Sequence, residues 1–468
     1  MRLQKETLTL RAEAVDGSTE GQIKVKDHQA ATSGVASGES SIFRKRLTDV
    51  RSRISRSRLI IRSVLALLGS NITSSVLGVI GGLLVARFLG PEVTGPFRAY
   101  TIPLAYLMFF DFGINDGLWR QIPYYVGKAM PERVDGLASA VGAFVLFLSV
   151  IFSFGFVCCA TYSLLHQDLY GFAGWLSQAF FCWAVFYGSY LNSTYRTLNH
   201  FVTMARIQVV ESLLNFGMVF LLPFLRFYGL CARAALPSIL ALWLFHRKRP
   251  LKVAYRFNAK DLSEVIKTGF LFSVWGTLYT SAWVATESAL ILSLSGATAL
   301  GLFSVAYAVR GAMSILPTAM WQVLTPRVVT ALVRDGSVHS ANTRIIWVTA
   351  GLTGLMILLA WAGSFFLDIF VPYVIPKYVA GIPVMKVCLW FSVVEAAFLP
   401  MNVLFATGRS WLYGRSVIAG IVVFPLATYL LLPTLGGLLA VAVGSLLGRT
   451  ARTLAAYMDL VLLTRREA

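Results

Sequence analysis

An arginine in the middle of an apolar segment is the residue best suited to chemistry in this sequence. Arg310 lies about eleven residues into a predicted transmembrane segment that begins near Ala299, which at about 1.5 Å per residue is close to the bilayer midplane. Tyr307 and Ser314 share its helix face. Because a guanidinium offers five donors in one plane, we predict that Arg310, Tyr307 and Ser314 bind a phosphate or pyrophosphate group of the substrate. The alternative is a structural ion pair between Arg310 and a carboxylate on another helix.

Other ionisable residues also lie inside apolar segments, where charge is costly and usually functional. Glu287 lies in the predicted seventh segment and Glu395 in the tenth. Burial raises the proton affinity of a carboxylate, so either residue could couple transport to a proton or sodium gradient, or could be a static partner of Arg310. Arg449 and Arg452 lie in the inner half of the last segment, and we expect them to extend to the cytoplasmic surface.

Two further pairs lie near the predicted membrane surfaces. Asp111 and Arg120 follow the second apolar segment at its inner end, where they would form a cytoplasmic gate or simply solvate the helix end. Arg87 and Arg98 lie near the outer end of the first helical hairpin. There they would bind an anionic headgroup of the substrate or extend to the membrane surface.

Small residues recur at every fourth position of the first apolar segment. They are Ser70, Ser74, Gly78 and Gly82, and Asn71 lies beside them. Such a stripe allows another helix to approach closely. The alternative is that this face lines a cleft, which makes Asn71 a further candidate for substrate binding.

The composition requires most of the chain to lie in a membrane. Of 468 residues, 57% are hydrophobic and 13% are charged, and the mean hydropathy is +0.69. About twelve apolar runs are long enough to span a bilayer, and the alternation typical of a β-barrel is missing. We therefore predict an all-α membrane protein with about twelve transmembrane helices. The basic residues behind the net charge of +19 gather in the N-terminal tail and the inner loops, whereas few lie in the predicted outer loops, among them Arg226 and Arg233. This pattern predicts cytoplasmic termini and does not favour binding to nucleic acid.

Four regions follow from this distribution. Residues 1–58 are polar and are predicted to form a disordered, basic cytoplasmic tail that meets anionic membrane lipids. Residues 59–250 are predicted to form an N-terminal lobe of six helices and residues 268–468 a C-terminal lobe of six. Residues 251–267 would be a cytoplasmic linker between the lobes.

A short turn pattern occurs twice, with a separation of 206 residues. It comprises Gly90, Gly95 and Phe97, and again Gly296, Gly301 and Phe303. The recurrence indicates a duplicated unit. Because six spans is an even number, the two lobes would share one orientation and be related by a pseudo-two-fold axis along the membrane normal. Two such bundles enclose a cleft that can open to either side, which is typical of a carrier.

Signatures of an enzyme are missing from the sequence. It contains no phosphate-binding loop and no paired-aspartate metal motif, and its five histidines lack the spacing of metal ligands. We therefore predict a transporter without a bound metal or organic cofactor. A membrane polysaccharide polymerase would need a sizeable outer loop or clustered catalytic carboxylates, and the predicted outer loops are all short.

Three stretches carry a resemblance to a known family: ARFLGPEVTGPF, DFGINDGLWRQIP and LSGATALGLFSVAYAVR. They resemble the polysaccharide (oligosaccharide-lipid) flippases of the multidrug/oligosaccharidyl-lipid/polysaccharide exporter superfamily. The resemblance implies a two-lobed carrier in the bacterial plasma membrane. Such a carrier moves a polyprenyl-pyrophosphate-linked oligosaccharide to the outer leaflet by alternating access, and Arg310 matches the cationic cavity residues of the family. Glu287 stands where relatives often place an aspartate followed by a basic residue, so the resemblance leaves its ion-coupling role open.

Two other functions stay open at this stage. The first is a cation-coupled multidrug exporter of the same superfamily, which would favour cavity carboxylates over a midplane arginine. The second is the membrane polysaccharide polymerase. For the flippase, the expected partners are lipid-linked oligosaccharide, anionic lipids and the polymerase and export machinery, and the protein is expected to act as a monomer.

Overall fold

The computed structural model describes residues 66–67, 69–321, 323–324, 338–401 and 410–467. Every regular element within these ranges is helical. Among the described residues, eight helices are long and apolar enough to cross a membrane. The expectation of an all-α, multi-pass membrane protein is confirmed.

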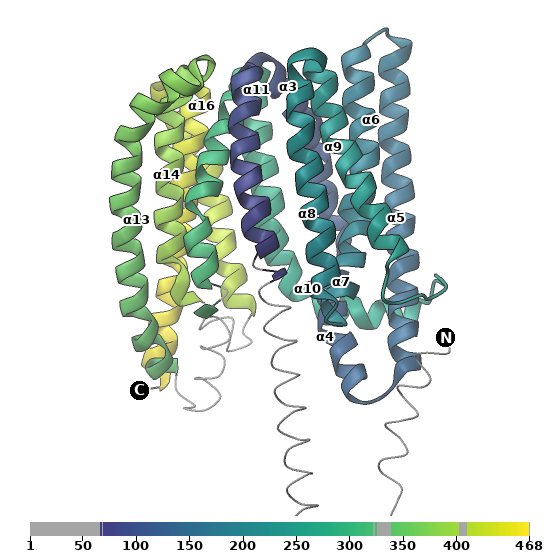
Figure 1. Ribbon diagram of the computed structural model, residues 1–468. Coiled ribbons are helices and arrows are strands. Elements are labelled where there is room, and N and C mark those ends of the chain that lie inside the picture. The colour runs from purple at the N-terminus through teal and green to yellow at the C-terminus, as the bar shows by residue number, and fades with distance from the viewer. Residues whose placement is uncertain (1–65, 68, 322, 325–337, 402–409, 468) are drawn as a thin grey trace, which may run out of the picture. The chain divides into compact units, whose positions relative to one another are not determined.

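The N-terminal half, residues 69–247, consists of helices that run side by side (Figure 1). They are Gly69–Phe88, α3 (Pro91–Leu107), η1 (Met108–Asp111), α4 (Ile114–Gly127), α5 (Pro131–Leu165), α6 (Leu169–Trp183), η2 (Ala184–Gly188), α7 (Ser189–Thr197), α8 (Phe201–Gly217), η3 (Met218–Leu221) and α9 (Leu222–Arg247).

The C-terminal half, residues 259–467, continues this arrangement. Its described elements are α10 (Ala259–Thr277), η4 (Leu278–Ala282), α11 (Trp283–Met313), α13 (Val338–Val374), η5 (Pro376–Gly381), α14 (Ile382–Ala397), η6 (Leu399–Met401) and α16 (Ser410–Glu467). Each half has its own large buried cluster of apolar side chains. One cluster contains Val141 and Phe186, and the other contains Met356 and Phe391.

Three of the long helices contain a sharp bend at a residue with positive φ. The residues are Arg226 in α9, Gly296 in α11 and Gly436 in α16, with φ of 45°, 80° and 71°. Glycine adopts such angles without the steric cost that a Cβ brings.

At the bend in α16 the chain folds back on itself. A Cβ added to Gly448 would lie 2.9 Å from the carbonyl oxygen of Gly420, and one added to Gly444 would lie 2.8 Å from the backbone nitrogen of Thr428. These partners lie on opposite sides of Gly436, so the two arms of α16 form an antiparallel hairpin.

The second apolar segment extends further than the sequence predicted. We expected it to close on a polar cluster formed by Asp111, Asn115, Asp116 and Arg120. Instead the chain breaks at Phe112 and Gly113, whose φ angles are 48° and 73°, and then forms α4 as far as Gly127. The polar cluster therefore lies at a break inside a longer helical segment and not at its end.

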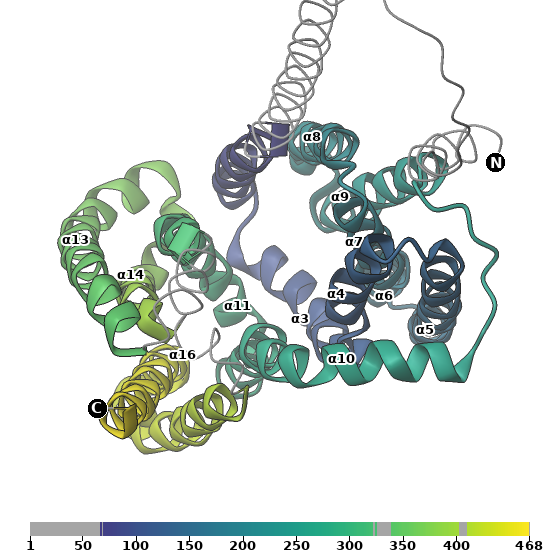
Figure 2. The same cartoon turned by 90° about the horizontal axis from the view of Figure 1, so that it is seen from below.

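Helix α4 packs against the start of α10 (Figure 2). A Cβ on Gly113 would lie 2.8 Å from the backbone of Gly269, so only glycines fit at this crossing. Leu262 and Val265 of α10 belong to the buried cluster of the N-terminal half. The segment predicted as a linker, 251–267, is thus helical from Ala259 onward and packs on the N-terminal helices.

The two repeated turns meet each other. A Cβ on Gly95 of α3 would overlap the carbonyl oxygen of Ala297 in α11, and one on Gly301 of α11 would lie 2.7 Å from Cα of Pro91 in α3. Ala297 follows Gly296 as Pro91 follows Gly90, so equivalent positions of the repeat make reciprocal contacts.

Candidate functional site

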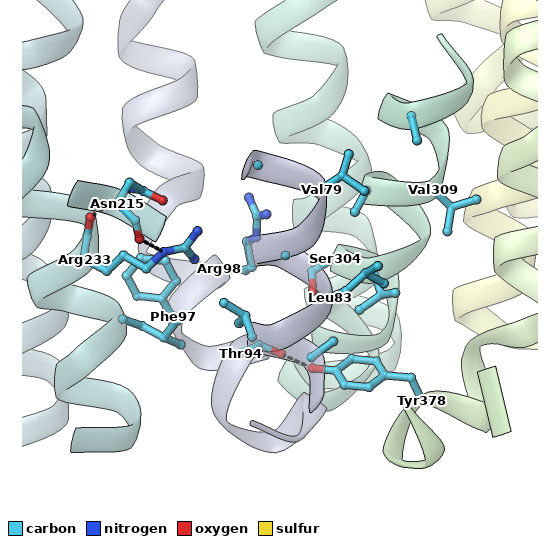
Figure 3. A pocket seen from close by; sticks show the side chains of 18 of the residues that line it. Val79, Leu83, Thr94, Phe97, Arg98, Asn215, Arg233, Ser304, Val309 and Tyr378 are labelled. Atoms are coloured by element: carbon cyan, nitrogen blue, oxygen red, sulfur yellow. Dashed lines mark hydrogen bonds between the residues drawn. The ribbon is translucent and has the colours of Figure 1, made fainter. Parts of the chain in front are cut away.

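A cavity of about 790 Å³ lies between the two halves (Figure 3). The N-terminal half contributes residues from the helix Gly69–Phe88 and from α3, α6, α8 and α9, and the C-terminal half from α11, α13, η5 and α14. Near the repeated turns, the Thr94 hydroxyl is 3.0 Å from the Tyr378 hydroxyl and joins the two sides.

Two arginines of the N-terminal half extend into this cavity. Figure 3 shows the side chains of Arg98 on α3 and Arg233 on α9 pointing into the same space. Arg233 donates from Nε to the backbone oxygen of Asn215 at 3.1 Å, which fixes its direction. With Glu211 on α8, the described residues that line the cavity include two cationic side chains and one carboxylate, and this balance favours an anionic ligand.

A buried amide adds an open hydrogen-bonding position to the same wall. Gln178 on α6 lines the cavity and has no exposed surface. Its Nε2 donates to Ser177 Oγ at 3.2 Å, whereas no donor of the described residues reaches its Oε1. A buried acceptor without a partner is costly, so this oxygen is an unsatisfied hydrogen-bonding position in the wall of the cavity.

Arg310 forms the structural ion pair that was the alternative to substrate binding. Its Nη2 is 2.6 Å from Glu395 Oε1, and its Nη1 donates to the Tyr307 hydroxyl at 2.6 Å. Ser314 Oγ donates to the other oxygen of Glu395 at 2.5 Å. The cluster unites four predicted residues, but none of the four is among the residues that line the cavity.

A second ion pair lies next to the first and is completely buried. Arg449 Nη2 is 3.0 Å from Glu287 Oε1, and the two side chains are 1% and 0% exposed. Trp283 donates to the same oxygen at 2.9 Å, and Tyr279 accepts from Arg449 at 3.0 Å. Arg449 also lies 3.9 Å from Glu395, so the two ion pairs form one network.

The prediction that the last arginines extend to the cytoplasmic surface is wrong. Arg449 is 1% exposed and Arg452 is 4% exposed. The Arg452 guanidinium lies between two aromatic rings, 3.4 Å from the centroid of Tyr279 and 3.6 Å from that of Phe398. Cation–π contacts hold this charge inside the protein, and helix position alone did not reveal them.

Comparison with known protein families shows to which family the chain belongs. The family described as "Polysaccharide biosynthesis protein" matches residues 60–332. The chain belongs to this polysaccharide biosynthesis family. No curated protein matches the chain.

Solved structures show that this family member has the fold of transporters of the MOP superfamily. An inward-facing multidrug resistance MATE family transporter is 15% identical, with a TM-score of 0.65 over 84% of this chain and 96% of that one. A transporter from Pyrococcus furiosus, described as having a binding pocket of reversed polarity, is 13% identical with a TM-score of 0.58 over 87% and 95%. An outward-facing MATE transporter is 14% identical with a TM-score of 0.55 over 87% and 96%.

In this family member, the remaining substrate-binding candidates are divided between two places. Arg98 lines the cavity, whereas Asn71 and Arg87 are exposed and do not. Of the small-residue stripe, Gly78 and Gly82 line the cavity. One end of the stripe therefore faces the cavity. This agrees with the interpretation that the stripe lines a cleft, which was the alternative to close helix packing.

The gate candidates lie beside the break in the second helical segment. Asp111 accepts a hydrogen bond from Asn115 at 2.8 Å. A gate formed by Asp111 and Arg120 stays a prediction. The described residues contain no group of three or more histidine, cysteine, aspartate or glutamate side chains placed to hold a metal ion.

Sequence reasoning missed four cavity residues with charged or amide side chains, which are Gln178, Glu211, Asn215 and Arg233. It assigned Arg233 to an outer loop, but the residue lies in α9 beyond the bend at Arg226. Gln178, Glu211 and Asn215 were not considered. The rule that singled out Arg310, an ionisable residue in an apolar run, would also have found Arg233 and Glu211.

Proposed function

We propose that this chain is a flippase that moves polyprenyl-pyrophosphate-linked oligosaccharide across a bacterial plasma membrane for surface polysaccharide export. The polysaccharide biosynthesis family and the transporter fold support the general class. The observation that carries the substrate assignment is the pair Arg98 and Arg233, which point into a cavity between the halves.

The chemistry of the cavity fits the polar part of such a substrate. Guanidinium groups bind phosphate oxygens through charge-assisted hydrogen bonds, and a pyrophosphate offers enough oxygens for Arg98 and Arg233 together. Gln178, Glu211 and Asn215 offer amide and carboxylate groups for sugar hydroxyls. Arg310, which sequence analysis favoured for this role, is better explained as the partner of Glu395.

Alternating access is the transport mechanism we propose. Within the part of the chain that the structure describes, dividing α9, α11 and α16 at their bends and counting the broken segment from α3 to α4 as one span supports a proposal of twelve spans in two lobes. The reciprocal contact of Gly95 and Gly301 is the pattern that a pseudo-two-fold axis produces. If both termini are cytoplasmic, the contact between Gly95 and Gly301 lies on the outer side of the membrane and closes the cavity there. A carrier closed on its outer side is inward-facing. The TM-score is higher against the inward-facing structure than against the outward-facing one, which supports this state.

A cation-coupled multidrug exporter is the second candidate, favoured by the multidrug transporters among the structural relatives. Two observations count against it. An organic cation would meet two guanidinium groups in the cavity. The carboxylates proposed for ion coupling, Glu287 and Glu395, are already paired with Arg449 and Arg310. A proton or sodium gradient would then act through other groups.

Further parts of the proposal concern the surroundings of the carrier. The N-terminal tail, residues 1–58, lies outside the described residues, and we propose that it contacts anionic lipids of the inner leaflet. We further propose a monomer that passes its product to polymerase and export machinery. A polymerase activity is disfavoured because the fold is that of transporters.

Complementation tests the substrate assignment. In a host that lacks the gene, Arg98→Gln and Arg233→Gln should fail to restore surface polysaccharide although the protein accumulates in the membrane. Arg87→Gln is the matched control, because Arg87 is exposed and does not line the cavity. Full restoration by both cavity variants would refute the assignment.

A further inference from the structure

The two walls of the cavity differ in chemistry. The N-terminal half supplies the charged and amide side chains Arg98, Gln178, Glu211, Asn215 and Arg233. The wall from the C-terminal half is mainly apolar and includes Val309, Met313, Phe366, Phe370 and Leu389. We call this second group of five the apolar wall.

The polar side chains among the C-terminal lining residues are already satisfied. Ser304 donates to the backbone oxygen of Gly301 at 2.6 Å, and the Tyr378 hydroxyl pairs with Thr94 at 3.0 Å. The apolar wall therefore adds no open hydrogen-bonding position, in contrast to Gln178 across the cavity. A wholly polar ligand would leave apolar surface against water on this side.

Part of the apolar wall is uncovered. Phe366 is 57% exposed, and its ring stacks on Phe370 with 4.9 Å between centroids. Both rings belong to α13 and line the same cavity as Arg98 and Arg233. A single ligand can therefore touch the cationic side chains and the aromatic rings together, provided that it joins an anionic group to a hydrocarbon.

Building on the proposed function, we propose that the apolar wall binds the phosphate-proximal hydrocarbon of a lipid diphosphate whose anionic group binds Arg98 and Arg233. The cavity volume of about 790 Å³ lies in the range that accommodates one ligand of moderate size. It receives the diphosphate, the adjoining sugar and the first units of the chain, while the rest of a long polyprenyl chain stays in the bilayer. The segregated walls hold the substrate in one orientation during transport.

Calorimetry on the purified protein in non-ionic detergent tests this subsite with two probes, inorganic pyrophosphate and geranylgeranyl diphosphate. The unmodified protein should bind the lipid diphosphate more tightly, because the chain buries apolar surface. Phe366→Gln should lower the ratio of the two affinities by about fivefold and leave pyrophosphate binding unchanged. Phe365→Gln is the control, since Phe365 is adjacent on α13 and equally exposed at 56% but does not line the cavity.

The outcomes separate the subsite from the proposed function. Arg98→Gln should weaken both probes by a similar factor. If pyrophosphate binds but Phe366→Gln and Phe365→Gln give the same affinity ratio, the lipid subsite is refuted and the anion site stands. If pyrophosphate does not bind the unmodified protein, the proposed function itself fails.

Discussion

Replacing Glu287 by glutamine should destabilise the protein strongly. The substitution keeps the shape of the side chain but removes the charge that faces Arg449 at 3.0 Å. Both side chains are at most 1% exposed, so water cannot solvate the arginine that is left. Breaking a buried ion pair from one side costs about 3–5 kcal/mol. We expect the lower end, about 3 kcal/mol, because Glu395 lies 3.9 Å from Arg449 and compensates part of the charge.

The matched control is an ion pair on the surface of the same half. Lys386 Nζ is 2.7 Å from Asp368, and the side chains are 36% and 48% exposed. Asp368→Asn should therefore cost about 1 kcal/mol or less, even though this pair is shorter than the buried one. Denaturant unfolding of the two purified variants in the same detergent gives the free energies of unfolding directly.

The result also decides between two roles for Glu287. A static partner of Arg449 predicts a large loss of stability, and a second substitution, Arg449→Met, should recover much of it. If Glu287→Gln is as stable as Asp368→Asn and instead loses gradient-driven transport, the reasoning is wrong and Glu287 is an ion carrier.

Three further predictions concern the cavity and its closures. Glu211→Gln should strengthen pyrophosphate binding by about threefold in calorimetry, because it removes the cavity carboxylate; weaker binding would contradict the anion assignment. Gly95→Ala should hold the repeated turns apart, so that a cysteine at Ser304 in a cysteine-free background reacts with an impermeant outside maleimide. Gly78→Ala is the control, because a Cβ added at Gly78 has no atom within 4 Å, and it should leave the labelling of that cysteine low. Equal labelling in the two variants would refute the proposal that the repeated turns close the outer side. Arg133→Ala removes ion pairs of 2.8 and 2.5 Å to α10 and should speed hydrogen exchange at the start of α10, whereas unchanged exchange there would show that these pairs do not hold it.

The sequence predicted the membrane class and the repeat because both depend on local signals. Apolar runs long enough to span a bilayer show a multi-pass helical protein directly. The glycines at 95 and 301 marked turns in which the backbone comes close to another segment, and the structure shows that the two turns contact each other. That mutual contact depends on how the halves pack and could not be read from spacing.

The candidate site was predicted only in part, because depth in the membrane does not tell which way a side chain points. Arg310 and Arg233 both lie in apolar segments, yet one pairs with Glu395 inside the C-terminal half and the other faces the cavity. Rotation about the helix axis decides between these roles, and packing sets that rotation. The bend at Arg226 had a further effect, since it moved Arg233 from an expected loop into a helix.

The most direct test of the account is the leaflet position of lipid-linked repeat units in a host that lacks this gene. Spheroplasts would be treated with an impermeant glycan-modifying reagent, and the modified fraction of the lipid-linked repeat units would be measured with and without the gene. The account predicts that the units accumulate unmodified on the cytoplasmic side without the gene. The intact gene should restore their exposure, and Arg233→Gln should not. Equal modification in all strains would contradict the flippase assignment.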